Sequence, residues 1–139
     1  MIEWENDWIN EKYMETWDRI AFRDEMKKRT KRFAVQCVKF YQGLPNNQEA
    51  WVIGKQFLRS ATSIAANYRA ACRARSGSEF FSKLCIVVEE NDETLFWLEL
   101  LEETGIVDKE TIRPIYVECE EILKIMVTSR KNSDPKKNK

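Results

Sequence analysis

The chain has 139 residues, 43% hydrophobic and 33% charged, and its 23 basic and 23 acidic side chains give a formal net charge of zero. One soluble globular domain is therefore expected. The N-terminus is acidic rather than signal-like and no apolar run is long enough to span a bilayer, so we expect a cytoplasmic protein with no membrane partner. The absence of histidine excludes Ser-His and Cys-His nucleophile pairs, the Glu-x-x-His motif of di-iron bundles, and zinc sites that use histidine.

The first 21 residues are aromatic and acidic. Trp4, Trp8 and Trp17 lie among carboxylates, and the spacing of four between Ile9 and Tyr13 suits a short amphipathic helix. Two interpretations stay open. The segment lies across its own bundle, or it is an arm that docks on another subunit, since tryptophan is a favoured interface anchor.

Apolar side chains recur with helical spacing in four segments, at about residues 22–42, 48–74, 79–103 and 109–130. The stripe of the first segment begins at Phe22. Because the connecting loops are short, the segments predict an all-α, up-down-up-down antiparallel four-helix bundle over residues 22–131. Residues 1–21 form an extra N-terminal helical or extended segment, and residues 132–139 form a basic tail that we expect to be disordered.

Helix boundaries are marked by residues that cap helices. Asn46 or Asn47 is expected to cap the second helix and Ser78 the third. Gly105 suits the end of the third helix, and Asp108 suits the start of the fourth.

The four cysteines are far apart and form no Cys-x-x-Cys pair: Cys37, Cys72, Cys85 and Cys119. Each falls within an apolar helical pattern. Free, buried thiols are therefore expected, rather than a disulfide framework.

The second helix combines small residues with arginines. Small residues let a neighbouring backbone come close, so we expect the side of this helix that carries Ser60, Ala61, Ala65 and Ala71 to supply subunit contacts. Asn67 lies among alanines, where its amide either hydrogen-bonds across a helix interface and sets the register, or is exposed on the outer face.

The charges are unevenly distributed. Residues 22–42 include seven basic and two acidic side chains, and residues 46–75 include five and one. Residues 76–105 reverse this balance, with one basic and eight acidic side chains. The electrostatic field at each part of the surface, rather than the net charge of the chain, therefore determines which partners bind.

The run from residue 27 to 32 is the best candidate for nucleic-acid binding, through Lys27, Lys28, Lys31 and Arg32. Three interpretations stay open: a solvated face, contact with phosphates through several cations at once, and pairing with an acidic partner subunit.

A second group of cations lies on the second helix: Arg59, Arg69, Arg73 and Arg75. Ion pairs with carboxylates of the next helix, within or between subunits, are the first interpretation, because guanidinium suits bidentate pairing with carboxylate. Those carboxylates are Glu89, Glu90, Asp92 and Glu93. Phosphate binding is the second interpretation for these arginines.

The carboxylates do not form a recognisable catalytic or metal site. Glu90 and Glu93 share a helix face, and Glu118 and Glu121 lie on the last helix. Hard cations take oxygen ligands, but neither a histidine nor a known loop motif accompanies these acids. We therefore expect no catalytic residue, no metal and no cofactor.

Residues 59–70, 73–76, 79–80, 83–84 and 89–101 resemble the bacterial four-helix-bundle proteins encoded within intervening sequences of 23S rRNA genes. The accessory proteins of diversity-generating retroelements are relatives of that family. The similarity covers about residues 22–131.

The resemblance implies a small bundle without enzymatic activity that assembles into a ring-like homopentamer. Relatives in retroelements bind a reverse transcriptase and nucleic acid through basic surfaces. We therefore expect a homo-oligomeric interaction scaffold whose partner is nucleic acid or a nucleic-acid-handling protein. The alternative is a protein that binds RNA or DNA directly through the basic surfaces of its first two helices.

Overall fold

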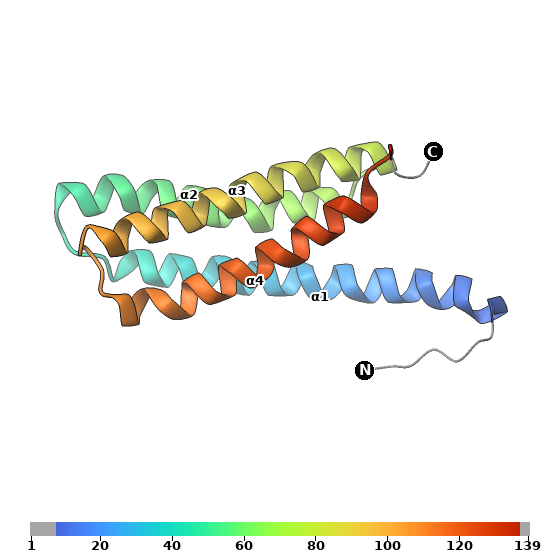
Figure 1. The fold of residues 1–139 in the computed structure, drawn as a ribbon, viewed down its shortest axis with the longest axis horizontal. Coiled ribbons are helices and arrows are strands. Elements are labelled where there is room, and N and C mark those ends of the chain that lie inside the picture. Colours follow the sequence, from blue (N-terminus) through green and yellow to red (C-terminus); the bar gives the residue numbers. More distant parts are fainter. Residues whose placement is uncertain (1–7, 137–139) are drawn as a thin grey trace.

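The structure, a computed structural model, describes residues 8–136, with side chains from residue 18 onward. This part of the chain contains four α-helices and no strand: α1 (Trp8–Gln42), α2 (Gln48–Cys72), α3 (Gly77–Glu103) and α4 (Lys109–Ser133). The helices run alternately up and down, as Figure 1 shows, which confirms the predicted four-helix bundle. None of these helices combines the length and the apolar character that a membrane-spanning helix requires.

The first helix is much longer than the other three. It has 35 residues, about 52 Å at 1.5 Å per residue, whereas the others have 25 to 27. Its N-terminal part therefore extends beyond the rest of the bundle (Figure 1). We expected a helix that begins near Phe22, but neither glycine nor proline occurs between Trp8 and Gln42, so nothing in the chain interrupts the helix.

Two of the expected N-caps and the expected C-terminal glycine are confirmed. The Asn47 side chain accepts a hydrogen bond from the Ala50 N–H at 2.9 Å, and Asp108 accepts one from the Thr111 N–H at 2.8 Å. Gly105 follows α3 with φ of 72°, the left-handed conformation that glycine adopts without strain.

The N-cap predicted for the third helix was wrong by two residues. The helix begins at Gly77, and the Ser76 Oγ accepts a hydrogen bond from the Glu79 N–H at 3.1 Å. Ser78 lies inside the first turn. Ser76 has Glu79 three residues later, which is the capping-box spacing, whereas Ser78 has Phe81 there, so the sequence pattern favours Ser76.

The four helices share one core. Contacts run from α1 to α2, from α2 to α3, from α3 to α4 and, less extensively, from α4 to α1, so α1 and α3 occupy diagonally opposite positions. Large fully buried side chains come from every helix and include Phe33, Tyr68, Leu98 and Ile122. Phe22, which was expected in this core, is 44% exposed, because it lies where α1 and α4 separate.

Small residues bring α2 and α3 together. Ser60 and Ala61 are fully buried, and the Thr94 hydroxyl of α3 donates a hydrogen bond to the Ser60 oxygen at 2.9 Å. We expected this side of α2 to contact another subunit. Ser60 faces α3 of the same chain instead, and Ala61 and Ala71 are buried in the core, whereas Ala65 is half-buried.

Asn91 is the buried amide of the bundle. This side chain is fully buried in α3. One orientation of the amide satisfies both of its polar atoms. In that orientation the nitrogen donates to the Cys119 carbonyl at 2.9 Å, and the oxygen accepts from the Leu123 N–H at 3.2 Å. These two backbone groups belong to one turn of α4. Asn91 therefore fixes α4 against α3 in a single register.

Asn67 does not have the cross-helix role that was one of its two interpretations. Its side-chain nitrogen donates to the backbone oxygen and the hydroxyl of Ser63, at 2.9 and 2.8 Å, and Ser63 lies one turn earlier in the same helix. The side chain is half-buried.

We expect Asn91→Ala to lower the free energy of unfolding by about 2 to 3 kcal/mol, because it removes two buried hydrogen bonds and leaves a cavity. Asn67→Ala is the matched control, and it should change stability by less than about 0.5 kcal/mol, because its hydrogen bonds are local and alanine favours a helix. Urea unfolding followed by circular dichroism measures both. Equal losses in the two variants would contradict the assigned role of Asn91.

Candidate functional site

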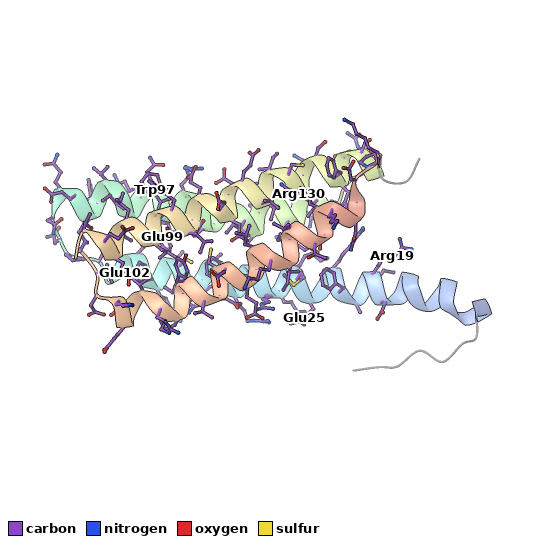
Figure 2. All side chains as sticks on the ribbon, in the orientation of Figure 1. Arg19, Glu25, Trp97, Glu99, Glu102 and Arg130 are labelled. Carbon is purple, nitrogen blue, oxygen red and sulfur yellow. The ribbon has the colours of Figure 1, made fainter. Side chains whose placement is uncertain are left out.

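Positive charge collects at one end of the bundle. The C-terminal end of α2, the C-terminal end of α4 and the part of α1 that contains Arg19 and Arg23 lie there, because alternate helices run in opposite directions. In Figure 2, Arg19 and Arg130 lie toward this end, whereas Glu99 and Glu102 of α3 lie toward the other. The uneven charge of the sequence thus becomes a separation of charge in space.

The four cations predicted on α1 differ in their surroundings. Lys27 lies 3.1 Å from Asp24, and Arg32 lies 3.2 Å from Glu25, in ion pairs within α1. Lys28 and Lys31 are exposed and make no ion pair among the residues that the structure describes. These two lysines are therefore available to a partner.

The arginines of α2 separate into two groups. Arg59 reaches α3, where it pairs with Glu90 at 3.2 Å and also with Glu93. The Trp97 indole donates to the same Glu93 carboxylate at 3.0 Å, so this carboxylate is shared by two side chains. Glu89 and Asp92, the other two predicted carboxylates, are exposed and belong to no ion pair within residues 18–136.

The other three arginines do not reach the carboxylates of α3 that were suggested for them. Arg75 lies 3.8 Å from Glu79, four residues further along the chain. Arg69 and Arg73 are exposed, and within the described part of the chain neither forms an ion pair. Arg69 lies in the last turn of α2 and Arg73 is its C-cap residue, so both are far from residues 89–93 in the middle of the antiparallel α3.

A stronger ion-pair cluster connects α1 to α4. The Arg29 guanidinium donates two hydrogen bonds to the Glu118 carboxylate, at 2.7 and 3.0 Å, and lies 2.9 Å from Glu121. The hydrogen bonds to Glu118 and then Glu121 raise the pKa of Arg29 above its ordinary value. The sequence offered Arg29 as one of several adjacent cations, and only the helix packing distinguishes it.

A groove opens between α1 and α4 at the basic end. Its volume is about 720 Å³, and its lining residues come from all four helices: Arg19, Phe22, Arg23, Tyr68, Gly77, Phe80, Lys124, Ile125, Thr128, Ser129, Asn132 and Ser133. Three of them are cations, and none is an acid. The Arg23 guanidinium lies over the Phe80 ring, 4.1 Å from its centroid.

Tyr68 closes the inner side of the groove. Burial and contact with Cys72 raise the pKa of the Tyr68 hydroxyl, so the phenol is neutral at physiological pH. Hydroxyls and an amide from α4 line the opposite side, at Thr128, Ser129 and Asn132. A groove with apolar walls and cations at its rim suits an anionic partner that also has an apolar or aromatic part.

All four cysteines are free, as predicted, but Cys72 and Cys85 are only half-buried rather than buried. Cys37 and Cys119 are buried, and burial raises the pKa of both thiols. Among the described residues, no group of three or more cysteine, aspartate or glutamate side chains is placed to hold a metal ion.

The predicted aromatic anchors lie outside the part of the structure whose side chains are described. Trp4 precedes the described residues, and Trp8 and Trp17 belong to α1 without a described side chain.

A protein-family model described as 23S rRNA-intervening sequence protein matches residues 24–128. The chain belongs to this family. The match covers most of the bundle and confirms the resemblance on which the sequence prediction was based.

One solved structure supports the same assignment. A protein of unknown function from the S23 ribosomal protein family of Bacteroides thetaiotaomicron VPI-5482 has 39% sequence identity with this chain and a TM-score of 0.73. The alignment covers 78% of this chain and 97% of that one. A search of curated proteins found no match.

The match to the 23S rRNA-intervening sequence protein family includes only part of the groove. Tyr68, Phe80 and Lys124 lie within the matched residues. The α1 wall, formed by residues 19, 22 and 23, precedes them. The long N-terminal part of α1 is thus a feature of this chain outside the family match.

We expect Arg29→Met to lower the free energy of unfolding by about 1 to 2 kcal/mol, because Glu118 then loses a bidentate partner while it is only 28% exposed. Arg32→Met is the matched control on the same helix. Its pair with Glu25 is exposed, so the loss should stay below about 0.5 kcal/mol. Urea unfolding midpoints of the two variants test the difference, and similar values would contradict it.

Proposed function

We propose that this chain is a non-enzymatic, homo-oligomeric helical bundle that acts as an interaction scaffold for nucleic acid or for a protein that handles nucleic acid. The observation that supports the oligomer most directly is the set of large apolar side chains left outside a filled core. They occur on all four helices: Ile20, Phe22, Val35, Val38, Trp51, Val52, Ile86, Phe96, Val117 and Val127. Apolar side chains mark a contact surface where they are neighbours, as Val35 and Val38 are, three residues apart on α1.

The proposal of a scaffold without catalysis is based on the chemistry of the groove and the composition of the chain. The groove residues include hydroxyls and cations but no carboxylate beside them to act as a base. The chain also lacks histidine. Binding through shape and charge is the function that such a surface supports best.

A pentamer is the assembly that the family resemblance implies. A ring of identical subunits needs two different, complementary faces on each copy, because each contact joins unlike surfaces. A chain with a basic end and an acidic helix supplies such faces.

We expect size-exclusion chromatography with light scattering to give a mass of about five times the 16.5 kDa of one chain at micromolar concentration. Light scattering gives the mass directly, whereas the elution position on the column also depends on the elongated shape of a helical protein. A mass of one chain at that concentration would contradict the oligomer.

Direct binding of RNA or DNA is the alternative function, and exposed cations at the groove end favour it. Arg69 and Arg73 are exposed and make no ion pair within the described region, and Arg23 and Lys124 line the groove at the same end of the bundle. Phosphate contacts by several cations release counterions, so the affinity would fall steeply with salt.

If this alternative holds, Arg69→Glu combined with Arg73→Glu should weaken binding of a single-stranded RNA at least tenfold at low salt. The slope of log affinity against log salt should decrease in magnitude by about 1.4, about 0.7 for each lost phosphate contact to a single strand. Fluorescence anisotropy measures both quantities. Lys109→Glu with Arg113→Glu is the matched control, because it makes the same charge change at the far end of the bundle. An equal loss of RNA affinity in this control would contradict a local binding site.

A further inference from the structure

The groove between α1 and α4 leaves an aromatic ring uncovered. Phe22 lies four residues before Met26, on the face of α1 that is buried further along the helix, yet it is 44% exposed and lines the groove. The Phe80 ring of α3 lines the same groove, with the Arg23 guanidinium 4.1 Å from its centroid. The groove therefore offers two flat side chains to an occupant, the ring of Phe22 and the guanidinium of Arg23.

Both rims of the groove are basic. Arg19 and Arg23 belong to the α1 wall, and Lys124 belongs to the α4 wall. Lys124 lies 3.7 Å from Glu120, but 75% of the lysine side chain is exposed, so this pair holds the ammonium only weakly. Among the described residues, no acidic side chain lines the groove. Charge complementarity therefore favours an occupant that has negative charge at each rim.

The space between the rims suits a flat group with polar edges. The volume of about 720 Å³ lies within the range of roughly 300 to 1,000 Å³ of sites that hold small molecules. Thr128, Ser129 and Asn132 of α4 supply hydroxyls and an amide, which both donate and accept hydrogen bonds. The edges of nucleic-acid bases also donate and accept, whereas an acyl chain or a phenyl ring does neither. A base therefore fits this wall better than a lipid or an aromatic peptide does.

We propose that this groove binds one unpaired nucleotide of a nucleic-acid strand. The base lies on the Phe22 ring, and its polar edge faces the hydroxyls and the amide of α4. The strand crosses the groove, so the phosphate on one side of the base meets Arg19 and the phosphate on the other side meets Lys124. Proteins that bind single strands hold unstacked bases on aromatic and arginine side chains in this way.

The proposed site selects single strands. A base within a duplex is already stacked and paired, so it is not available to a side chain in a groove. Cations on both rims also favour a strand over a free nucleotide, because only a strand has a phosphate on each side of the base. The inference rests on nucleic acid being the partner in the proposed function, and it does not depend on the number of subunits.

The α1 wall makes this site a feature of the present chain. The match to the family model begins at residue 24, after Arg19, Phe22 and Arg23. The wall exists because α1 continues past the point where α4 separates from it (Figure 1).

Phe22→Ala in the full chain tests the stacking surface. It should lower the affinity for a single-stranded RNA of mixed sequence about tenfold, a typical effect of one lost base stack. The slope of log affinity against log salt should stay the same, because no phosphate contact is lost. The affinity for a fully paired RNA should also stay the same. Fluorescence anisotropy over a series of salt concentrations measures all three quantities.

Phe96→Ala is the matched control. Phe96 is a phenylalanine of similar exposure, 54%, and it lies about 24 Å from Phe80 along α3. This variant should bind both RNAs as the unaltered chain does. Because Phe22 and Phe96 are both exposed, circular dichroism should be the same for the two variants and the unaltered chain.

Lys124→Gln tests the rim and should have a different signature. The affinity for single-stranded RNA should fall and the slope should decrease in magnitude by about 0.7, the value for one phosphate contact to a single strand. Lys109→Gln, in the first turn of the same helix, is the control and should change neither quantity. A DNA strand of the same sequence shows which strand the groove takes, because Phe22→Ala has to weaken the binding of RNA, of DNA or of both.

Several results would overturn the nucleotide site alone. These are equal losses in Phe22→Ala and Phe96→Ala, an equal loss for paired RNA, and competition by adenosine monophosphate at the affinity of the strand. An unaltered chain that binds neither RNA nor DNA would overturn this site together with the direct-binding alternative. The proposed oligomer is judged separately by light scattering of the same samples, so a monomeric mass would overturn the oligomer and leave the groove result in place.

Discussion

The close approach of α2 and α3 is the constraint on which the rest of the bundle depends. Ser60 and Ala61 are small enough for the two helices to pack with a buried hydrogen bond between Ser60 and Thr94. That contact sets the register in which Arg59 meets Glu90 and Glu93. Larger residues there would separate the helices and break both the polar contact and the ion pairs.

The position of α4 follows from a second buried polar contact. Asn91 bonds to the backbone of one turn of α4 and so determines how that helix lies on α3. Arg29 then fastens α1 to α4 through Glu118 near the same level. Beyond this level the two helices separate, and the groove that contains Phe22 and Lys124 results.

Charge is arranged on this framework in two ways. Along the bundle, the groove cations Arg19, Arg23 and Lys124 lie at one end, and Glu99 and Glu102 lie toward the other (Figure 2). Across the bundle, the outer faces of α1 and α3 differ in sign and both include exposed apolar side chains. A neutral chain can therefore present surfaces for identical copies and still leave a basic groove for an anionic partner. Both features suit a scaffold more than a catalyst.

Much of the secondary structure was determined locally. The side chains of Asn47 and Asp108 and the backbone freedom of Gly105 act on their own turns, so the sequence alone located these helix ends. The family resemblance was also readable from residues 59–101. Helical periodicity predicted which face of each helix is apolar, because that pattern depends only on the spacing of residues along the chain.

The tertiary structure determined which side chains of other helices each helix face contacts. The sequence favoured Asn67 as the amide between helices, but Asn91 is the buried one, because burial depends on which helix lies opposite. Arg29 could not be distinguished from its basic neighbours until α4 placed Glu118 beside it. Phe22 has the spacing of a core residue, yet it lines an open groove, since α4 no longer covers α1 at that point. Spacing along a helix is a local property, whereas the partner of a side chain is determined by residues that are distant in the sequence.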